Sequence, residues 1–185
     1  MTPGEVRIIG GLWKRSKLPV ANVPGLRPTP DRVRETLFNW LGQDLNGWVC
    51  VDPFAGSGAL GFEAASRGAA AVVLAETQAQ CVMAMEKSKD RLCAAQLKIQ
   101  RTDGLSLLRQ LPLQSQDLVF LDPPYDYASY EQALKMTHQC LKPSGYAYLE
   151  SHKAWSADEL KLLGWQQVRY LKAGSVHAHL LQTTA

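Results

Sequence analysis

The chain has 185 residues, of which 46% are hydrophobic and 20% charged, and its formal net charge is +3. This length and composition are typical of one globular domain with a sizeable core. Neither a run of roughly 20 apolar residues, as a membrane-spanning helix needs, nor the apolar segment of a signal peptide is present, so we expect a cytoplasmic protein without membrane contact. The four cysteines lie far apart without a CxxC pair, which fits neither a disulfide framework nor a zinc site.

Positive charge gathers at the start of the chain. Residues 1–34 hold seven basic and two acidic side chains, a net charge of +5. A basic arm on a near-neutral body indicates a polyanionic partner, whereas the alternative is a solvated, partly disordered tail. The side chains that we expect to contact the partner are Arg7, Lys14, Arg15, Lys17, Arg27 and Arg32.

The segment 27–41, RPTPDRVRETLFNWL, predicts the first helix. Thr29 is a suitable cap and Pro30 suits the first helical position. The apolar residues that follow fall on one face of a helix. This helix would pack by that face and present Arg27 and Arg32 near its N-terminal end.

From residue 48 onward, short apolar runs alternate with helical patterns. The predicted strands are 48–52, 71–76, 97–103, 117–122, 146–151, 166–172 and 175–182, and the predicted helices lie near 58–67, 78–95, 104–110 and 129–141. Such alternation predicts an α/β fold, a parallel sheet covered on both faces. The last two strands are joined by a tight turn and must be antiparallel to each other. We find no internal repeat or long linker, so the chain reads as one domain with an N-terminal arm.

Four successive predicted strands end in an acid: Asp52, Glu76, Asp103 and Asp122. In open α/β sheets the ligand lies beyond the carboxyl ends of the strands. Aligned carboxylates there suggest a ligand rich in hydroxyls and amines, whereas the alternative is that these acids are only helix caps and turn residues.

A glycine loop follows the first strand. Residues 52–61, DPFAGSGALG, satisfy G-x-G-x-x-G at Gly56, Gly58 and Gly61, and Glu76 follows 18 residues after Gly58. Taken alone, this is the fingerprint of a dinucleotide-binding loop, so an NAD-dependent oxidoreductase stays open. No Gly-Lys-Ser/Thr follows, which excludes a Walker P-loop.

Two features favour S-adenosylmethionine over NAD. Asp52 lies at the mouth of the loop, where its charge would repel a pyrophosphate and attract a cationic amine. S-adenosylmethionine offers an ammonium, a sulfonium, a ribose diol and an adenine amine to the acids. The sequence also has no evident partner for hydride transfer.

The segment FLDPPYD, residues 120–126, supplies the chemistry. Pro123 and Pro124 stiffen the backbone and remove amide donors, so carbonyl acceptors stand beside the carboxylate of Asp122. A planar exocyclic amine could donate both hydrogens to Asp122 and the Pro123 carbonyl while its lone pair faces the sulfonium methyl. Tyr125 would stack on the base, a contact worth roughly 1–3 kcal/mol. The pattern predicts a methyltransferase with Asp122, Pro123, Pro124 and Tyr125 in the catalytic site.

The motifs RIIGGLWKRSKLPV, GLRPTPDRVRETLFNWL, VDPFAGSGALGFEAASRGA and LVFLDPPY resemble the bacterial RsmD-type methyltransferases, from about Arg7 to the last strands. The resemblance implies a Rossmann-like class I fold with a seven-stranded, mostly parallel sheet and an antiparallel C-terminal strand. It also implies methylation of the exocyclic 2-amino group of guanine 966 in 16S ribosomal RNA, within the assembled or assembling small subunit. Neighbouring ribosomal proteins would be further contacts.

Residue roles follow from the same resemblance. Asp52, Phe54, Ala55, Gly56 and Gly58 would surround the methionine part of the cofactor, Glu76 would hold the ribose, and Asp103 would meet the adenine amine. The basic arm would grip RNA phosphates. We therefore divide the chain into an RNA-contacting arm and first helix, residues 1–41, and a methyltransferase domain, residues 42–185, and expect a monomer.

Three alternatives remain open at this stage. A DNA adenine-N(6) methyltransferase could use the same DPPY segment, an NAD-dependent oxidoreductase could use the glycine loop, and a non-catalytic RNA-binding module could use the arm. His177 and His179 share one face of a predicted strand but have no third ligand nearby in the sequence. We therefore expect no metal site.

Overall fold

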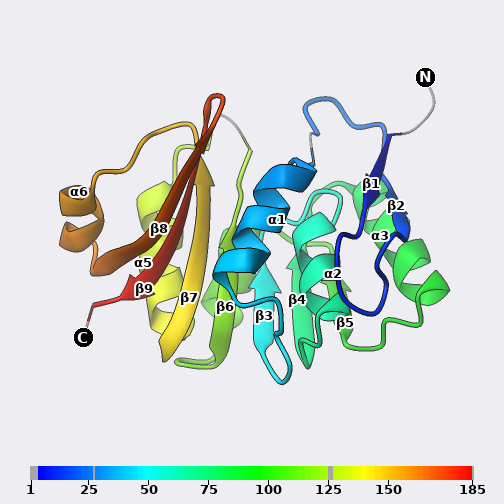
Figure 1. Cartoon of the computed structure of the whole chain (residues 1–185), viewed down its shortest axis with the longest axis horizontal. Helices are drawn as coiled ribbons and strands as arrows, with labels where there is room; N and C mark the ends of the chain where they lie inside the picture. Colours follow the sequence, from blue (N-terminus) through cyan, green and yellow to red (C-terminus); the bar gives the residue numbers. More distant parts are fainter. Residues whose placement is uncertain (1–3, 27, 125–126, 185) are drawn as a thin grey trace.

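The computed structural model describes residues 4–26, 28–124 and 127–184 (Figure 1). Its strands are β1 (Glu5–Arg7), β2 (Lys17–Pro19), β3 (Val49–Asp52), β4 (Ala71–Ala75), β5 (Leu97–Gln100), β6 (Gln116–Leu121), β7 (Leu141–Ser151), β8 (Trp165–Ala173) and β9 (Val176–Thr183). Its helices are α1 (Asp31–Trp40), α2 (Ala59–Ser66), α3 (Ala79–Arg91), α4 (Gly104–Gln110), α5 (Tyr130–Cys140) and α6 (Ala157–Leu162). Within these residues, no helix combines the length and apolar character needed to cross a bilayer.

The main sheet has seven strands in the order β5-β4-β3-β6-β7-β9-β8. Pairing is parallel from β5 to β7, and β9 runs antiparallel to both β7 and β8. The predicted α/β fold and its antiparallel last strand are therefore confirmed. The chain order reverses direction between β3 and β6, and ligands of open α/β sheets bind at such a switch point.

Apolar side chains form one core on each face of this sheet. One core joins the N-terminal segment, α1 and α2 to the sheet, and Figure 1 shows α1 and α2 on the near side. The other core joins α4, α5 and α6 to the opposite face. Because successive strand residues point to opposite faces, this division also tells on which side each polar strand end lies.

Several predicted boundaries were wrong. β5 ends at Gln100, so Asp103 follows the strand by three positions instead of ending it. β7 begins at Leu141, directly after α5, and crosses an irregular register before residue 146. Helix α6 was not predicted; its six residues are too few for the periodicity that reveals a helix, although a capping box of Ser156 and Glu159 marks its start.

The N-terminal segment is folded against the domain. Strands β1 and β2 pair antiparallel, and Ile8 and Leu18 are buried in the first core. At Gly11 the backbone turns with φ +73°, and a Cβ would come within 1.9 Å of the Ser66 carbonyl oxygen. Only glycine fits this approach. The reading of a solvated, partly disordered tail is therefore wrong for residues 4–20.

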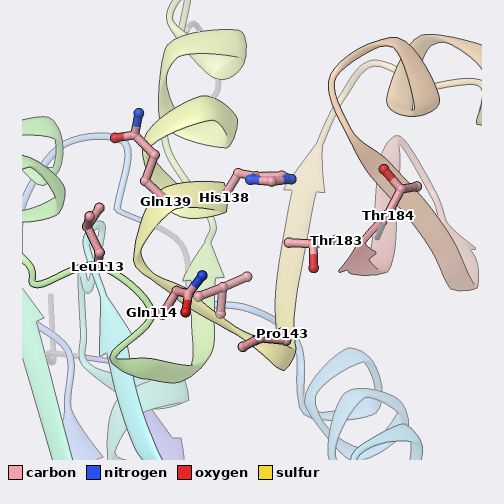
Figure 2. A pocket seen from close by; sticks show the side chains of 8 residues that line it. Leu113, Gln114, His138, Gln139, Pro143, Thr183 and Thr184 are labelled. Carbon is pink, nitrogen blue, oxygen red and sulfur yellow. The ribbon is translucent and has the colours of Figure 1, made fainter.

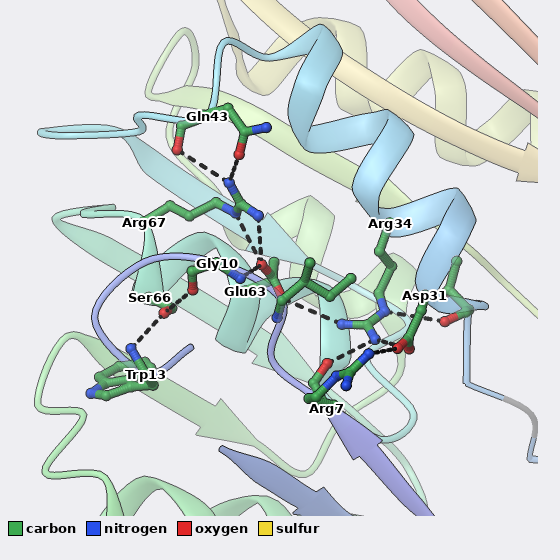
Figure 3. Close-up of polar contacts among 11 residues, drawn as sticks. Arg7, Gly10, Trp13, Asp31, Arg34, Gln43, Glu63, Ser66 and Arg67 are labelled. Atoms are coloured by element: carbon green, nitrogen blue, oxygen red, sulfur yellow. Dashed lines mark hydrogen bonds and ion pairs between the residues drawn. The ribbon is translucent and has the colours of Figure 1, made fainter. Parts of the chain in front are cut away.

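A buried ionic network holds this segment in place (Figure 3). The Glu63 carboxylate accepts the backbone N–H groups of Ile9 and Gly10, both at 2.8 Å. It also pairs with Arg34 at 3.3 Å and with Arg67 at 2.8 Å, and none of these three side chains is more than 5% exposed. One carboxylate of α2 thus ties the segment to α1 and to its own helix.

Candidate active site

The glycine loop connects β3 to α2 at the switch point. Gly56 and Gly58 have φ angles of +54° and +80°, which glycine adopts without strain. A Cβ at Gly58 would lie 2.8 Å from the Met85 sulfur, and one at Gly61 would lie 2.6 Å from a Leu74 methyl. The three glycines of the motif therefore serve the turn and the close packing of α2 on the sheet.

Asp52 is buried in this loop with an oxygen that is not satisfied. Its side chain is 1% exposed, and Oδ1 finds no hydrogen-bond partner among the described residues. Burial, and next the charge of Asp122, raise the Asp52 pKa to about 8, although the Phe54 N–H partly opposes the shift. A cation placed here would supply the missing partner and favour the charged carboxylate.

Glu76 follows β4 and closes the loop. Its carboxylate accepts the N–H of Gly56 at 3.0 Å and the N–H of Gln78 at 2.8 Å. Ala55 is buried at 8% exposure, and its N–H bonds to the Ala75 carbonyl. Asp52, Ala55, Gly56 and Glu76 are therefore brought together, as the loop motif predicted.

Asp103 has a different environment. It is exposed and caps α4, where its side chain accepts the Ser106 N–H at 2.9 Å. Hydrogen bonds from Ser106 lower the Asp103 pKa. The prediction that Asp103 ends a strand was wrong. For this acid the alternative interpretation, a helix cap, is confirmed. Phe54 reaches the same helix, because a Cβ at Gly104 would lie 2.7 Å from its ring.

The Asp122 carboxylate is held from the other end of the chain. Thr29 is buried, and its Oγ1 donates a hydrogen bond of 2.8 Å to Asp122 Oδ2. Helix α1 consequently begins at Asp31 after Pro30, with no side-chain cap, so the predicted capping role of Thr29 was wrong. The physical reason is that the hydroxyl donates to a carboxylate, a charge-assisted hydrogen bond stronger than one between neutral groups.

The proline pair supplies the predicted acceptor. Pro123 is buried and Pro124 is exposed. The Pro124 carbonyl accepts the Tyr127 N–H at 3.0 Å, whereas in the described residues no donor bonds to the Pro123 carbonyl. Asp122 Oδ1 likewise accepts no hydrogen bond from the described residues, so these two acceptors stand side by side for an amine donor. Tyr125, the predicted stacking ring, lies outside the described residues.

Other aromatic rings border this segment. Phe54 contacts Tyr127 edge-on at 5.0 Å between ring centroids, and Tyr127 contacts Tyr130 at 5.3 Å. Tyr130 continues to Trp155 at 6.2 Å. These rings connect the glycine loop to the start of α5 and give the site an apolar wall.

Glu150 is the residue that sequence reasoning missed. Phe120 and Tyr148 are register partners on β6 and β7, and both belong to the first core. Two positions further, Asp122 and Glu150 continue on the same face of the sheet. The signal was present in the sequence, because the fifth strand of the domain also carries an acid near its end.

Four carboxylates therefore follow the order of the central strands rather than the order of the chain. They are Glu76, Asp52, Asp122 and Glu150, after or within β4, β3, β6 and β7. Burial raises the pKa of both Asp122 and Glu150; the Asp122 charge is the second cause at Glu150, and the Thr29 hydrogen bond lowers the pKa of Asp122. Burial and the neighbouring carboxylates disfavour the charged forms of this row, and such perturbed groups are typical of functional sites.

The basic side chains do not converge on this site. Arg32 is exposed on the first turn of α1, and Arg7 pairs with Asp31 beside it. Lys14 and Arg15 are exposed in a loop held at the C-terminal end of α2, whereas the glycine loop lies at the opposite end of that helix. Lys17 forms a surface pair with Glu5. Arg27 lies outside the described residues.

A pocket of about 330 Å³ lies away from these groups (Figure 2). Its lining includes Gln114, which precedes β6, Pro143 near the start of β7, and Thr183 at the end of β9. These positions mark the amino ends of the parallel strands, opposite to the carboxylates. The described residues also contain no group of three or more His, Cys, Asp or Glu that could hold a metal ion.

Comparison with known proteins identifies the family of this chain. The family described as Conserved hypothetical protein 95 matches residues 6–182. Ribosomal RNA small subunit methyltransferase D of Haemophilus influenzae is 45% identical over 155 residues, covering 81% of this chain and 80% of its own length. The protein of the same name from Escherichia coli strain K12 is 38% identical over 98% of this chain and 92% of its own length.

Solved structures give the same result. The Escherichia coli protein yhhF, a proposed methyltransferase, superposes with a TM-score of 0.83 at 38% identity, covering 98% of this chain and 99% of its own. The family match covers the glycine loop, the DPP segment and all but the first residue of the β1–β2 pair. The chain therefore belongs to the Conserved hypothetical protein 95 family, together with these small-subunit methyltransferases D, and the RsmD-type resemblance is confirmed.

Proposed function

We propose that this protein transfers a methyl group from S-adenosylmethionine to the exocyclic 2-amino group of a guanine in 16S ribosomal RNA, with guanine 966 as the target. The proposal depends on the proximity of Asp52 to the acceptors of Asp122 and Pro123, which is seen in the effect of the Asp122 charge on Asp52. The unpaired, buried oxygen of Asp52 suits a cation, and the Asp122–Pro123 acceptors suit an amine. Relatives named ribosomal RNA small subunit methyltransferase D support the RNA class.

The residues at the switch point fit S-adenosylmethionine. When bound, this molecule supplies a methyl group on a positively charged sulfur. Asp52 would accept the ammonium group with the oxygen that has no partner among the described residues, and the turn at Gly56 and Gly58, with its positive φ angles, would border the ligand. Glu76 would exchange its hydrogen bond to Gly56 for the ribose hydroxyls. The adenine role of Asp103 stays a prediction.

The chain's own part in the reaction is to hold the acceptor amine. Asp122 Oδ1 and the Pro123 carbonyl would each accept one amine hydrogen, which turns the nitrogen lone pair toward the methyl group. Thr29 keeps the carboxylate in this orientation. Because burial raises its pKa, Asp122 can also take the proton that the methylated amine must lose.

The target base must leave its stack before it reaches these groups, at a cost of a few kcal/mol. Stacking on Tyr125 and on the wall of Tyr127 and Tyr130 would offset part of that cost. We propose residues 1–41 as the RNA-contacting part of the chain, with Arg27 and with Arg32 on the first turn of α1 among its phosphate contacts. The partner would be the assembled or assembling small ribosomal subunit in the cytoplasm. The protein would bind it as a monomer and would also contact neighbouring ribosomal proteins.

The proposal is tested with methyl-labelled S-adenosylmethionine and three acceptors: unmodified small ribosomal subunits, naked 16S RNA and duplex DNA. The products are digested and the labelled nucleoside is identified by mass. Label in 2-methylguanosine from the subunits is the expected result. Label in N(6)-methyladenine from DNA would keep the roles of Asp122 and Pro123 but replace the substrate, and the absence of label in all three would overturn the proposal.

A further inference from the structure

We propose that Glu150 selects guanine by accepting a hydrogen bond from the N1–H group that adjoins the amine held by Asp122. This inference rests on the proposed function. It adds that the choice of base depends on a residue outside the DPPY segment. The contacts of Glu150 and the chemistry of the guanine edge carry the argument.

The Glu150 carboxylate is oriented by its neighbours. The side chain is 8% exposed on β7, and the hydroxyl of Tyr148, itself fully buried, donates to Oε2 at 2.7 Å. Among the described residues no donor bonds to Oε1. Since Leu121 and Leu149 are register partners, Glu150 stands beside Asp122, one strand over. One oriented acceptor therefore remains next to the amine-binding pair.

The Watson–Crick edge of guanine carries two neighbouring hydrogen-bond donors, in the same order as the acceptors of the site. Its 2-amino group adjoins N1–H, so a base whose amine is held by Asp122 presents a further donor beside it. In adenine and in 2-aminopurine the nitrogen beside the amine is unprotonated and carries a lone pair. A carboxylate would accept from N1–H but would repel that lone pair, and both groups would lose their hydrogen bonds.

The charges around Glu150 set its ionisation. Asp122, which follows β6, His152, which follows β7, and Tyr130 on α5 face the two carboxylates. Burial first, and then the Asp122 charge, raise the pKa of Glu150 to about 8. The Tyr148 hydrogen bond favours the ionised carboxylate. A donor from guanine would act in the same direction as Tyr148, so a base with N1–H would stabilise the acceptor form that it needs.

The test compares two bases that carry the same 2-amino group. Small subunits are reconstituted with 16S RNA that has either guanine or 2-aminopurine at the target position, and kcat/KM for methyl transfer is measured for each. We expect the wild-type protein to prefer guanine by at least about 100-fold, since an acceptor site left unpaired rejects its ligand strongly. This comparison needs no variant and therefore does not depend on the folding of a mutant.

Glu150→Gln then isolates the N1 contact. Its amide can turn an N–H toward the bare N1 of 2-aminopurine, so the preference should fall at least about tenfold while S-adenosylmethionine affinity stays unchanged. Glu86→Gln makes the same change on the exposed side of α3 and should keep the wild-type preference. The amide variant also separates this contact from the missing O6 of 2-aminopurine, which no change at Glu150 would restore.

Three outcomes decide the inference. Equal wild-type use of guanine and 2-aminopurine would overturn it, because Glu150 would then not distinguish the two edges. An unchanged preference in Glu150→Gln would overturn it as well, and would assign selection to other groups. Absence of 2-methylguanosine from the wild-type reaction would instead overturn the proposed function, which makes the two failures distinguishable.

Discussion

The hydroxyl of Thr29 bonds to the carboxylate of Asp122 at 2.8 Å, although the two residues are 93 positions apart. Thr29 lies between the N-terminal segment and α1, and Asp122 follows the central strand β6. The segment that we propose for RNA contact therefore touches the residue that we propose for catalysis. Any displacement of the start of α1 would change the orientation and the pKa of that carboxylate.

Thr29→Val should lower methyl transfer about tenfold near pH 7, because it removes a hydrogen bond that favours the ionised form of Asp122. The loss should shrink as the pH rises, since Asp122 then ionises without help. Complete pH profiles of kcat measure this, and Thr29→Ser serves as the control that keeps the hydroxyl. Parallel profiles for wild type and Thr29→Val would contradict the role of Thr29.

Asp122→Ala should reduce kcat by about 100-fold or more, as expected when a positioned acceptor is removed from the reacting group. S-adenosylmethionine affinity should persist or rise near pH 7, because the Asp122 charge is one of the causes that raise the Asp52 pKa. Calorimetric titration of the variant measures this second effect. Unchanged turnover would refute the amine-binding role of Asp122.

Asp52→Asn should stabilise the ligand-free protein while abolishing S-adenosylmethionine binding. The folded-state pKa of Asp52 is raised to about 8, so between the ordinary aspartate range and pH 8 the folded state binds more protons than the unfolded state. Stability from this group therefore falls as the pH rises through that window. The melting temperature at pH 7.5 should be higher in the variant, by about 2–4 °C for each kcal/mol relieved.

Melting scans from pH 4 to pH 8 test this sign. The advantage of Asp52→Asn should nearly vanish near pH 4, where Asp52 is protonated in the folded state and about half protonated in the unfolded state. Glu86→Gln, which changes an exposed carboxylate to an amide, should follow the wild-type curve. An advantage that is constant over the whole range would mean that packing, and not protonation, separates the two proteins.

Glu63→Gln should destabilise the fold strongly. The change leaves Arg34 and Arg67 buried with less opposing charge, and breaking a buried pair from one side costs about 3–5 kcal/mol. A fall of about 10 °C in melting temperature is the expected size for a chain of this length. The partly exposed pair of Glu86 and Lys89 is the matched control, where the same change should cost less than about 1 kcal/mol.

Lys14→Ala combined with Arg15→Ala should weaken RNA binding and flatten its dependence on salt, because fewer counterions are released. Both side chains are exposed at the end of α2 that lies away from the glycine loop, so methyl transfer at saturating RNA should stay near the wild-type rate. Binding titrations over a series of salt concentrations measure the slope. Lys98→Ala with Lys161→Ala removes equal charge elsewhere on the surface and controls for net charge.

If the slope of the Lys14 and Arg15 double variant equals that of its control, these residues do not contact RNA. The same titration with Arg32→Ala then asks whether contact is confined to the start of α1. Lys14 and Arg15 lie beside the C-terminal end of α2, and Arg32 lies on the first turn of α1, so the comparison measures how far the RNA extends over the protein.

The sequence by itself determined the sheet, the glycine loop and the acceptor pair of Asp122 and Pro123. These features depend on local rules: apolar runs form buried strands, positive φ angles require glycine, and proline removes amide donors. Only the tertiary structure decided which acids meet. Asp103 lies between Glu76 and Asp122 in the chain but caps a helix. Glu150 joins the cluster instead, because β7 pairs with β6 and its side chains alternate in the same register. Thr29 was predicted as a helix cap but bonds to Asp122. The physical reason is the same, because strand order and long-range packing bring together residues that are far apart in the sequence.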